Sequence, residues 1–141
     1  MVKWSKDIEA LLQERFGKDS VLALATTQDN TPSVRQVDAF YADGSFYVLT
    51  YSLSTKMQHI AVNPKVAVCG EWFTAHGVGM SLGSFGAKKN APVASRMRQV
   101  FAAWIDNGHT DLSDPNTCIL RIQLTDAVWF ANGRCYAIDF T

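Results

Sequence analysis

Hydroxyl residues and a lysine stand where an apolar run gives way to a helical segment. Residues 46–49 are Phe-Tyr-Val-Leu, residues 50–56 are Thr-Tyr-Ser-Leu-Ser-Thr-Lys, and residues 57–62 have the pattern of a short helix. The first turn of a helix carries free N–H groups and a partial positive charge. A lysine in that turn is unfavourable unless an anion lies nearby, and helix N-termini are common phosphate sites. The segment therefore suggests a bound phosphate.

Arg35 is a second residue whose setting calls for an anion. It lies in a predicted strand over residues 33–41, where alternate side chains share a face. The other members of its row are mostly apolar: Ser33, Val37, Ala39 and Tyr41. A charge in such a row needs a partner. The sequence leaves open whether Arg35 pairs with a carboxylate, lies at an edge, or binds a phosphate through two parallel hydrogen bonds.

Arg35 and the segment Ser54-Thr55-Lys56 together indicate a phosphate site more strongly than either does alone. Alone, Ser54 is an ordinary helix N-cap and Lys56 an ordinary solvated charge. If the strands form a meander, Arg35 comes close to Ser54-Thr55-Lys56 in space. Together these residues supply two positive charges, two hydroxyls and the N–H groups of a helix. This set is sufficient to hold a monophosphate.

The elements that position these residues follow from periodicity and turn residues. Helices are predicted over residues 5–16, 54–62 and 91–106. Strands are predicted over 21–27, 33–41, 45–51, 65–73, 76–85, 118–124, 127–131 and 134–140. Tight turns at Ala42-Asp43-Gly44 and Asn132-Gly133 favour antiparallel pairing. We expect a single domain over residues 1–141, mainly β (α+β), with an antiparallel barrel and helices packed outside it.

Composition narrows the class of partner. The 141 residues carry 13 basic and 13 acidic side chains, so the net charge is zero and no broad basic surface for nucleic acid is expected. No apolar run is long enough to span a bilayer, and the first residues do not form a secretion signal. Cys69, Cys118 and Cys135 lie in apolar runs, which predicts buried thiols in a reducing compartment. We expect a cytoplasmic protein with no membrane association.

No metal site is predicted. The histidines His59, His76 and His109, taken with Cys69, do not have the spacing of known metal-ligand motifs. The glycine-rich stretch 77–83 misses the spacing of a dinucleotide-binding loop by one residue and lacks the surrounding βαβ unit. We expect either a bent strand or a mobile loop near the ligand there.

Several short motifs between residues 21 and 69 recur together in one protein family. They are Leu24-Ala25-Thr26, residues 29–32, Val34-Arg35-Gln36-Val37, residues 43–47, Thr50, Ser54-Thr55-Lys56 and residues 63–67. In this combination the chain resembles the pyridoxamine 5′-phosphate oxidase-like family, the FMN-binding split β-barrels. The resemblance implies a split β-barrel with FMN as its cofactor. It also implies a homodimer whose cofactor clefts lie at the subunit interface.

The resemblance assigns roles to individual residues. It implies that the FMN phosphate is held by Arg35, Ser54, Thr55 and Lys56. It implies that the ribityl chain and the ring are faced by residues 35–37 and 50–52, namely Arg35, Gln36, Val37, Thr50, Tyr51 and Ser52. Thr55 stands where the vitamin B6 oxidases of the family usually have an arginine, which predicts a weaker phosphate grip.

The resemblance does not extend to a particular reaction. True pyridoxamine phosphate oxidases carry a C-terminal substrate segment with arginine and histidine, and residues 136–140 show no such segment. The main hypothesis is an FMN-dependent oxidoreductase whose substrate and electron donor are undefined and for which no acid or base is named. The alternative is a non-catalytic flavin or haem sensor or carrier. A related cofactor, F420 or haem, remains an alternative to FMN.

Overall fold

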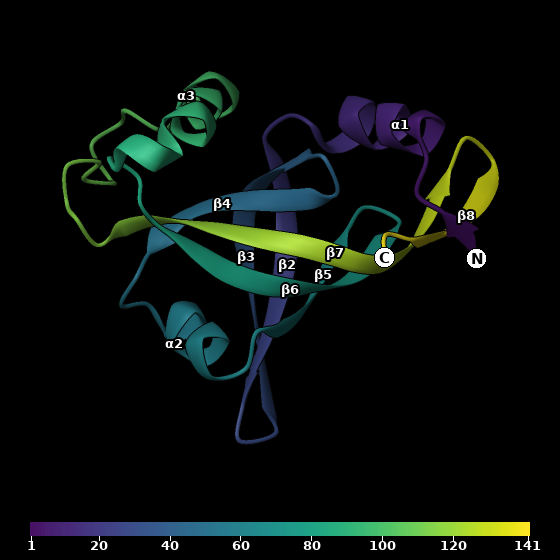
Figure 1. Cartoon of the computed structure of the whole chain (residues 1–141), viewed down its shortest axis with the longest axis horizontal. Helices are drawn as coiled ribbons and strands as arrows, with labels where there is room; N and C mark the ends of the chain where they lie inside the picture. Colours follow the sequence, from purple (N-terminus) through teal and green to yellow (C-terminus); the bar gives the residue numbers. More distant parts are fainter.

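A closed barrel of antiparallel strands forms the centre of the computed structural model, which describes residues 1–141 (Figure 1). Its strands are β2 (Ser20–Gln28), β3 (Thr31–Ala42), β4 (Ser45–Tyr51), β5 (Lys65–Gly70), β6 (Phe73–Ser84) and β7 (Thr117–Ala131). They are hydrogen-bonded in the order β7-β4-β3-β2-β5-β6, and β6 pairs with β7 to close the ring. The predicted split barrel, mainly β with helices outside, is therefore confirmed.

Strand β7 gives the barrel its split. On one edge, residues 117–123 pair with β4 and residues 126–131 pair with β8 (Arg134–Asp139), while the other edge follows β6. The short β1 (Val2–Lys3) adds to β8 in parallel. Two strands were expected over 118–131, and that prediction is wrong. Gly77 pairs with Leu124 but the preceding His76 pairs with Asp126, so a bulge bends β7 without ending it.

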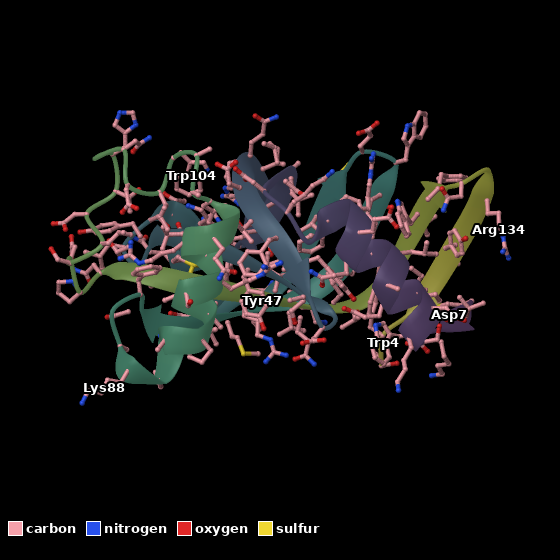
Figure 2. The ribbon with its side chains drawn as sticks, turned by 90° about the horizontal axis from the view of Figure 1, so that it is seen from above. Trp4, Asp7, Tyr47, Lys88, Trp104 and Arg134 are labelled. Carbon is pink, nitrogen blue, oxygen red and sulfur yellow. The ribbon has the colours of Figure 1, made fainter.

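Two apolar clusters lie on opposite sides of the β3–β4 hairpin. The larger fills the barrel, where α1 (Lys6–Phe16) closes one end with Ile8, Leu12 and Phe16. The smaller lies between the outer face of the hairpin and α3 (Ala91–Val100), which follows a 3₁₀ turn (Lys88–Asn90). Tyr47 and Trp104 pack at the margin of this second cluster, beside α3 (Figure 2).

Helix α2 (Thr55–Val62) lies on the side of the barrel opposite α1 and α3 (Figure 1). Met57 and Ile60 point into the barrel cluster. A Cβ at Gly79 would stand 3.2 Å from the Ile60 side chain, so the glycine of β6 allows close approach of this helix. The predicted helix over 54–62 is thus present, and it packs against the barrel on the side opposite α1.

Two further sequence predictions need correction. A helix was expected over 91–106, but α3 ends at Val100. The chain after it forms hydrogen-bonded turns, and Phe101 and Ile105 in these turns still pack in the second cluster. Of the cysteines expected to be buried, only Cys118 is; Cys69 and Cys135 are exposed. The reason is strand alternation: Val66 and Val68 of β5 point inward, so Cys69 points outward.

The helices are short. None of them combines the length and the hydropathy that crossing a lipid bilayer requires.

No three His, Cys, Asp or Glu side chains gather in an arrangement suited to a metal ion.

Candidate functional site

Arg35 lies on the barrel side of β3 and is anchored by a single nitrogen. Its Nη1 donates to the Thr26 hydroxyl at 2.8 Å, the Leu24 carbonyl at 3.1 Å and the Ser33 carbonyl at 3.4 Å. Arg35 takes part in none of the ion pairs of the structure. Burial lowers the pKa of the Arg35 guanidinium. The carboxylate partner that the sequence left open is absent, and Nε and Nη2 have no protein acceptor.

Lys56 brings a second positive charge to the same place. It is half-buried at the start of α2 and also forms no ion pair. Burial lowers the pKa of Lys56, and the nearby Arg35 charge lowers it further. Two neighbouring cations that lack a carboxylate form a site with unbalanced positive charge. Such a site favours an anion.

Ser54 occupies the N-cap position of α2 but does not cap the helix. Its side chain makes no cap hydrogen bond. Its hydroxyl oxygen is the one buried side-chain polar atom in the structure without a hydrogen-bond partner. By contrast, Ser5 caps α1 and accepts from the Ile8 N–H at 3.3 Å. The interpretation of Ser54 as an ordinary N-cap is therefore wrong, and its hydroxyl is free for a ligand beside the open N–H groups of the first turn.

Sequence reasoning missed two polar residues behind Arg35. Thr26 is 1% exposed and His59 is 5% exposed, and the Thr26 hydroxyl lies 2.8 Å from His59 Nδ1. The sequence gave His59 no role beyond excluding it from a metal motif. One signal was present: Thr26 continues the inward row of Leu22 and Leu24, where a hydroxyl needs a partner.

The residues expected to face the ring are spread over two faces. Val37 packs against the barrel cluster, whereas Gln36 is exposed on the outer face of β3. Thr50 is half-buried and pairs with Cys118, and Tyr51 is exposed. The structure thus brings Arg35, Ser54 and Lys56 together and leaves the side chains of Gln36 and Tyr51 outside that group.

The end of strand β4 and the polar loop after α3 form a pocket beside Thr50 and Tyr51. Ser52 is tied to the loop by its hydroxyl, which donates to Asn116 Oδ1 at 2.9 Å, and by its N–H, which donates to the Asn116 carbonyl at 2.7 Å. The pocket measures about 290 Å³ and is lined by Leu49, Thr50, Tyr51, His109, Thr110, Asp111, Asp114 and Thr117. Hydrogen bonds from the Ser113 hydroxyl and N–H lower the pKa of Asp111.

The outer face of the barrel carries a second depression. It measures about 250 Å³, and its walls are mainly small apolar side chains from β2, β3, β5, β6 and β7. Val34 is 70% exposed and Val128 is 39% exposed, and neither belongs to an apolar cluster. At its rim His76 Nδ1 lies 2.9 Å from Asp126 Oδ1. An uncovered apolar sheet face of this kind is typical of an interaction surface.

The fold is shared with several solved structures. General stress protein 26 from Bacillus anthracis is 17% identical with a TM-score of 0.67, and the match covers 92% of this chain and 98% of that chain. An FAD-binding protein from Mesorhizobium loti is 19% identical with a TM-score of 0.66, covering 88% and 92%. A heme binding protein from Mycobacterium smegmatis is 16% identical with a TM-score of 0.69, covering 99% of this chain and 60% of that chain. At these identities the likeness establishes the fold.

The sequence itself gives the family. None of the curated proteins matches the chain. A sequence model described as pyridoxamine 5′-phosphate oxidase, however, matches residues 8–128. This range includes β2 to β6, α2 and most of β7, and therefore every residue of the candidate anion site. The chain belongs to the pyridoxamine 5′-phosphate oxidase family.

Proposed function

We propose that this chain binds FMN, with the phosphate held between Arg35 and the N-terminal turn of α2, and that it is a flavin-dependent oxidoreductase. The observation that carries the proposal is the pair of cations, Arg35 and Lys56, beside the unpartnered hydroxyl of Ser54. Family membership supports a phosphorylated cofactor. The name of the FAD-binding protein from Mesorhizobium loti supports a flavin.

Each residue of the site has a distinct part in holding the phosphate. Arg35 offers Nε and Nη2 as a fork, because Nη1 is already used by the protein. Lys56 adds a point charge, and the Ser54 hydroxyl donates a hydrogen bond that it does not make within the protein. Thr55, exposed at the first position of α2, adds a hydroxyl and an N–H. Hydrogen bonds to a charged group contribute about 1.5–3 kcal/mol each.

The remaining residues orient the rest of the cofactor. Val37 and Thr50 flank the anion site on the strands β3 and β4, and the backbone of Gln36, Tyr51 and Ser52 continues those two edges. The bound flavin would supply hydride or electron transfer. The protein would bind it, orient it and exclude water. We assign no side chain as acid or base.

We further propose a homodimer in which a second copy covers the outer face of the barrel. Val34 and Val128 leave this face apolar and exposed. Val34 and Gln36 are on the opposite side of β3 from Arg35, so a partner seated there adjoins the strand that carries the anion site. The three cysteines are free thiols, which fits a reducing compartment, and we place the protein in the cytoplasm.

Flavin titration tests the proposal. Purified protein is mixed with FMN and, in parallel, with riboflavin, which lacks the phosphate, and quenching of flavin fluorescence is followed. We expect FMN to bind at least tenfold more tightly than riboflavin, and Arg35→Met to abolish the difference. Arg98→Met is the matched control, because Arg98 is an exposed arginine paired with Asp106. Absence of FMN binding at tens of micromolar would refute the proposal.

Turnover separates the enzyme from a sensor or carrier. If the protein is an oxidoreductase, a reduced nicotinamide or another electron donor bleaches the bound flavin in a stopped-flow experiment, and an acceptor restores its colour. Tight binding without reduction by any donor would instead favour the non-catalytic alternative.

Haem binding is a second candidate that one observation favours. His76 is exposed, and Asp126 holds its Nδ1 at 2.9 Å, which leaves Nε2 available beside an apolar depression of about 250 Å³. Carboxylates commonly orient metal-binding imidazoles in this way. The heme binding protein from Mycobacterium smegmatis shares the fold. A Soret band that forms on adding haemin and is lost in His76→Ala would establish this function.

A further inference from the structure

A chain of buried polar side chains connects the two halves of the anion site. Arg35 on β3 donates from Nη1 to the Thr26 hydroxyl on β2 at 2.8 Å, and that hydroxyl lies 2.8 Å from Nδ1 of His59 on α2. Thr26 is 1% exposed and His59 is 5% exposed, so water does not compete for these bonds. The same helix carries Lys56 at its N-terminal turn.

The direction of these hydrogen bonds is fixed by chemistry. A guanidinium only donates, so the Thr26 oxygen accepts from Arg35. The single hydroxyl proton of Thr26 has one acceptor within reach, His59 Nδ1. His59 is therefore the neutral tautomer with its proton on Nε2. A hydrogen on Nδ1 would leave the Thr26 proton buried without a partner.

We infer that His59 is a positioning residue for the anion site, acting through Thr26 on Arg35. This inference rests on the proposed function and adds a residue that orients the phosphate-binding arginine without touching the phosphate. The Thr26 bond is the shortest of the three that Nη1 makes, since the Leu24 and Ser33 carbonyls lie at 3.1 and 3.4 Å. With His59 in place, Arg35 is held at a fixed position relative to Lys56.

The structure supplies a matched control a single residue away. Asn63, which follows α2, donates from Nδ2 to the Thr27 hydroxyl at 2.9 Å. This bond joins the same helix to the same strand, but Thr27 makes no bond to Arg35. Thr27→Val therefore removes a comparable tie between α2 and β2 while leaving the Arg35 anchor intact.

Affinity measurements on the full chain test the role of His59. FMN and inorganic phosphate are titrated into wild type, Thr26→Val, His59→Leu, the double variant, His59→Asn and Thr27→Val. We expect Thr26→Val and His59→Leu each to weaken binding about threefold to tenfold. The double variant should bind as tightly as the single variant with the lower affinity, because both changes break the same network. His59→Asn keeps an acceptor at the Nδ1 position and is expected within about twofold of wild type, as is Thr27→Val.

Three outcomes of these titrations would overturn the inference. One is unchanged affinity in His59→Leu. A second is multiplication of the two single effects in the double variant, because independent residues add their free energies. Failure of His59→Asn to restore affinity while its melting temperature matches wild type would also contradict it.

Nuclear magnetic resonance of the ligand-free protein tests the network apart from the function. We expect imidazole ¹⁵N shifts of His59 typical of the Nε2–H tautomer, and faster rotation of the Arg35 guanidinium in His59→Leu than in wild type or Thr27→Val. If wild type binds neither FMN nor phosphate, the proposed function fails, and these spectra still decide the network. A proton on Nδ1, or Arg35 rotation that is unchanged in His59→Leu, refutes the inference in either case.

Discussion

Arg35 and Lys56 place two positive charges near each other with no carboxylate partner for either. The Arg35 charge lowers the pKa of Lys56, and neither side chain takes part in an ion pair. A folded protein tolerates such a pair at some cost in stability, since each charge is partly removed from water and repels the other. The repulsion between Arg35 and Lys56 therefore lowers the stability of the ligand-free protein and favours the binding of an anion.

Replacing Lys56 by methionine is expected to stabilise the ligand-free protein and to remove phosphate binding. The pKa of Lys56 lies below its ordinary value of 10.5, so between the two values the unfolded chain binds more protons than the folded one. The free energy of unfolding therefore rises with pH through that window in the ligand-free protein. FMN or phosphate should flatten this rise. Thermal melts of wild type and Lys56→Met from pH 7 to 10, with and without phosphate, measure both effects.

A Lys65→Met variant serves as control, since Lys65 is exposed at the start of β5. It should leave both the melting temperature and its phosphate dependence close to wild type. A lower melting temperature in Lys56→Met than in wild type, without ligand, would contradict the unbalanced-charge account.

Ser54→Ala and Ser5→Ala are expected to separate binding from capping. Ser54 makes no cap bond, so its replacement should leave the melting temperature nearly unchanged while FMN affinity falls about threefold or more. Ser5 caps α1, and its replacement should cost about 1 kcal/mol of stability with FMN affinity unchanged. Urea denaturation and flavin titration measure the two quantities. Equal losses of stability in both variants would show that Ser54 acts as a cap.

Asp38→Asn is expected to stabilise the protein at neutral pH. Burial raises the pKa of Asp38, and the charge of Asp19 and a hydrogen bond to it raise it further. Above 3.8 and up to the raised value the folded state binds more protons than the unfolded state, so stability falls as pH rises through that window. In Asp38→Asn the free energy of unfolding should not decrease over this pH range. Fluorescence of Trp104, whose indole N–H donates to Asp19 at 2.9 Å, reports unfolding from pH 4 to 8.

An exposed aspartate provides the comparison. Asp29 lies exposed in the turn between β2 and β3, and Asp29→Asn should melt close to wild type at pH 7. If Asp38→Asn melts at the same temperature as wild type at pH 7, the Asp38 carboxyl is not destabilising.

Val128→Glu is expected to convert the proposed dimer to a monomer without unfolding it. Val128 lies on the outer face and is 39% exposed, so a carboxylate there meets solvent in the monomer and an apolar partner in the dimer. Light scattering coupled to size-exclusion chromatography measures the mass. Val2→Glu changes an exposed valine on β1, outside this face, and should leave the mass unchanged. A wild-type monomer at high micromolar concentration would contradict the dimer itself.

Much of the fold was predictable because it depends on local patterns. Alternating apolar residues and the turns at Asp43-Gly44 and Asn132-Gly133 predicted the hairpins, and the structure contains them. The continuity of β7 was not predictable, because the bulge opposite His76 depends on pairing with a strand distant in the sequence. The exposure of Cys69 likewise depends on which face of β5 turns inward.

The sequence by itself determined which groups are available for an anion and roughly where they stand: Arg35 in an apolar row, and Ser54-Thr55-Lys56 where a strand meets a helix. Only the tertiary structure decided that Arg35 lacks a carboxylate, that the Ser54 hydroxyl is unpartnered, and that His59 reaches Arg35 through Thr26. Periodicity describes one element at a time. The contact between residues 26 and 59 exists only after α2 packs onto the barrel, so no pattern within either segment contains it.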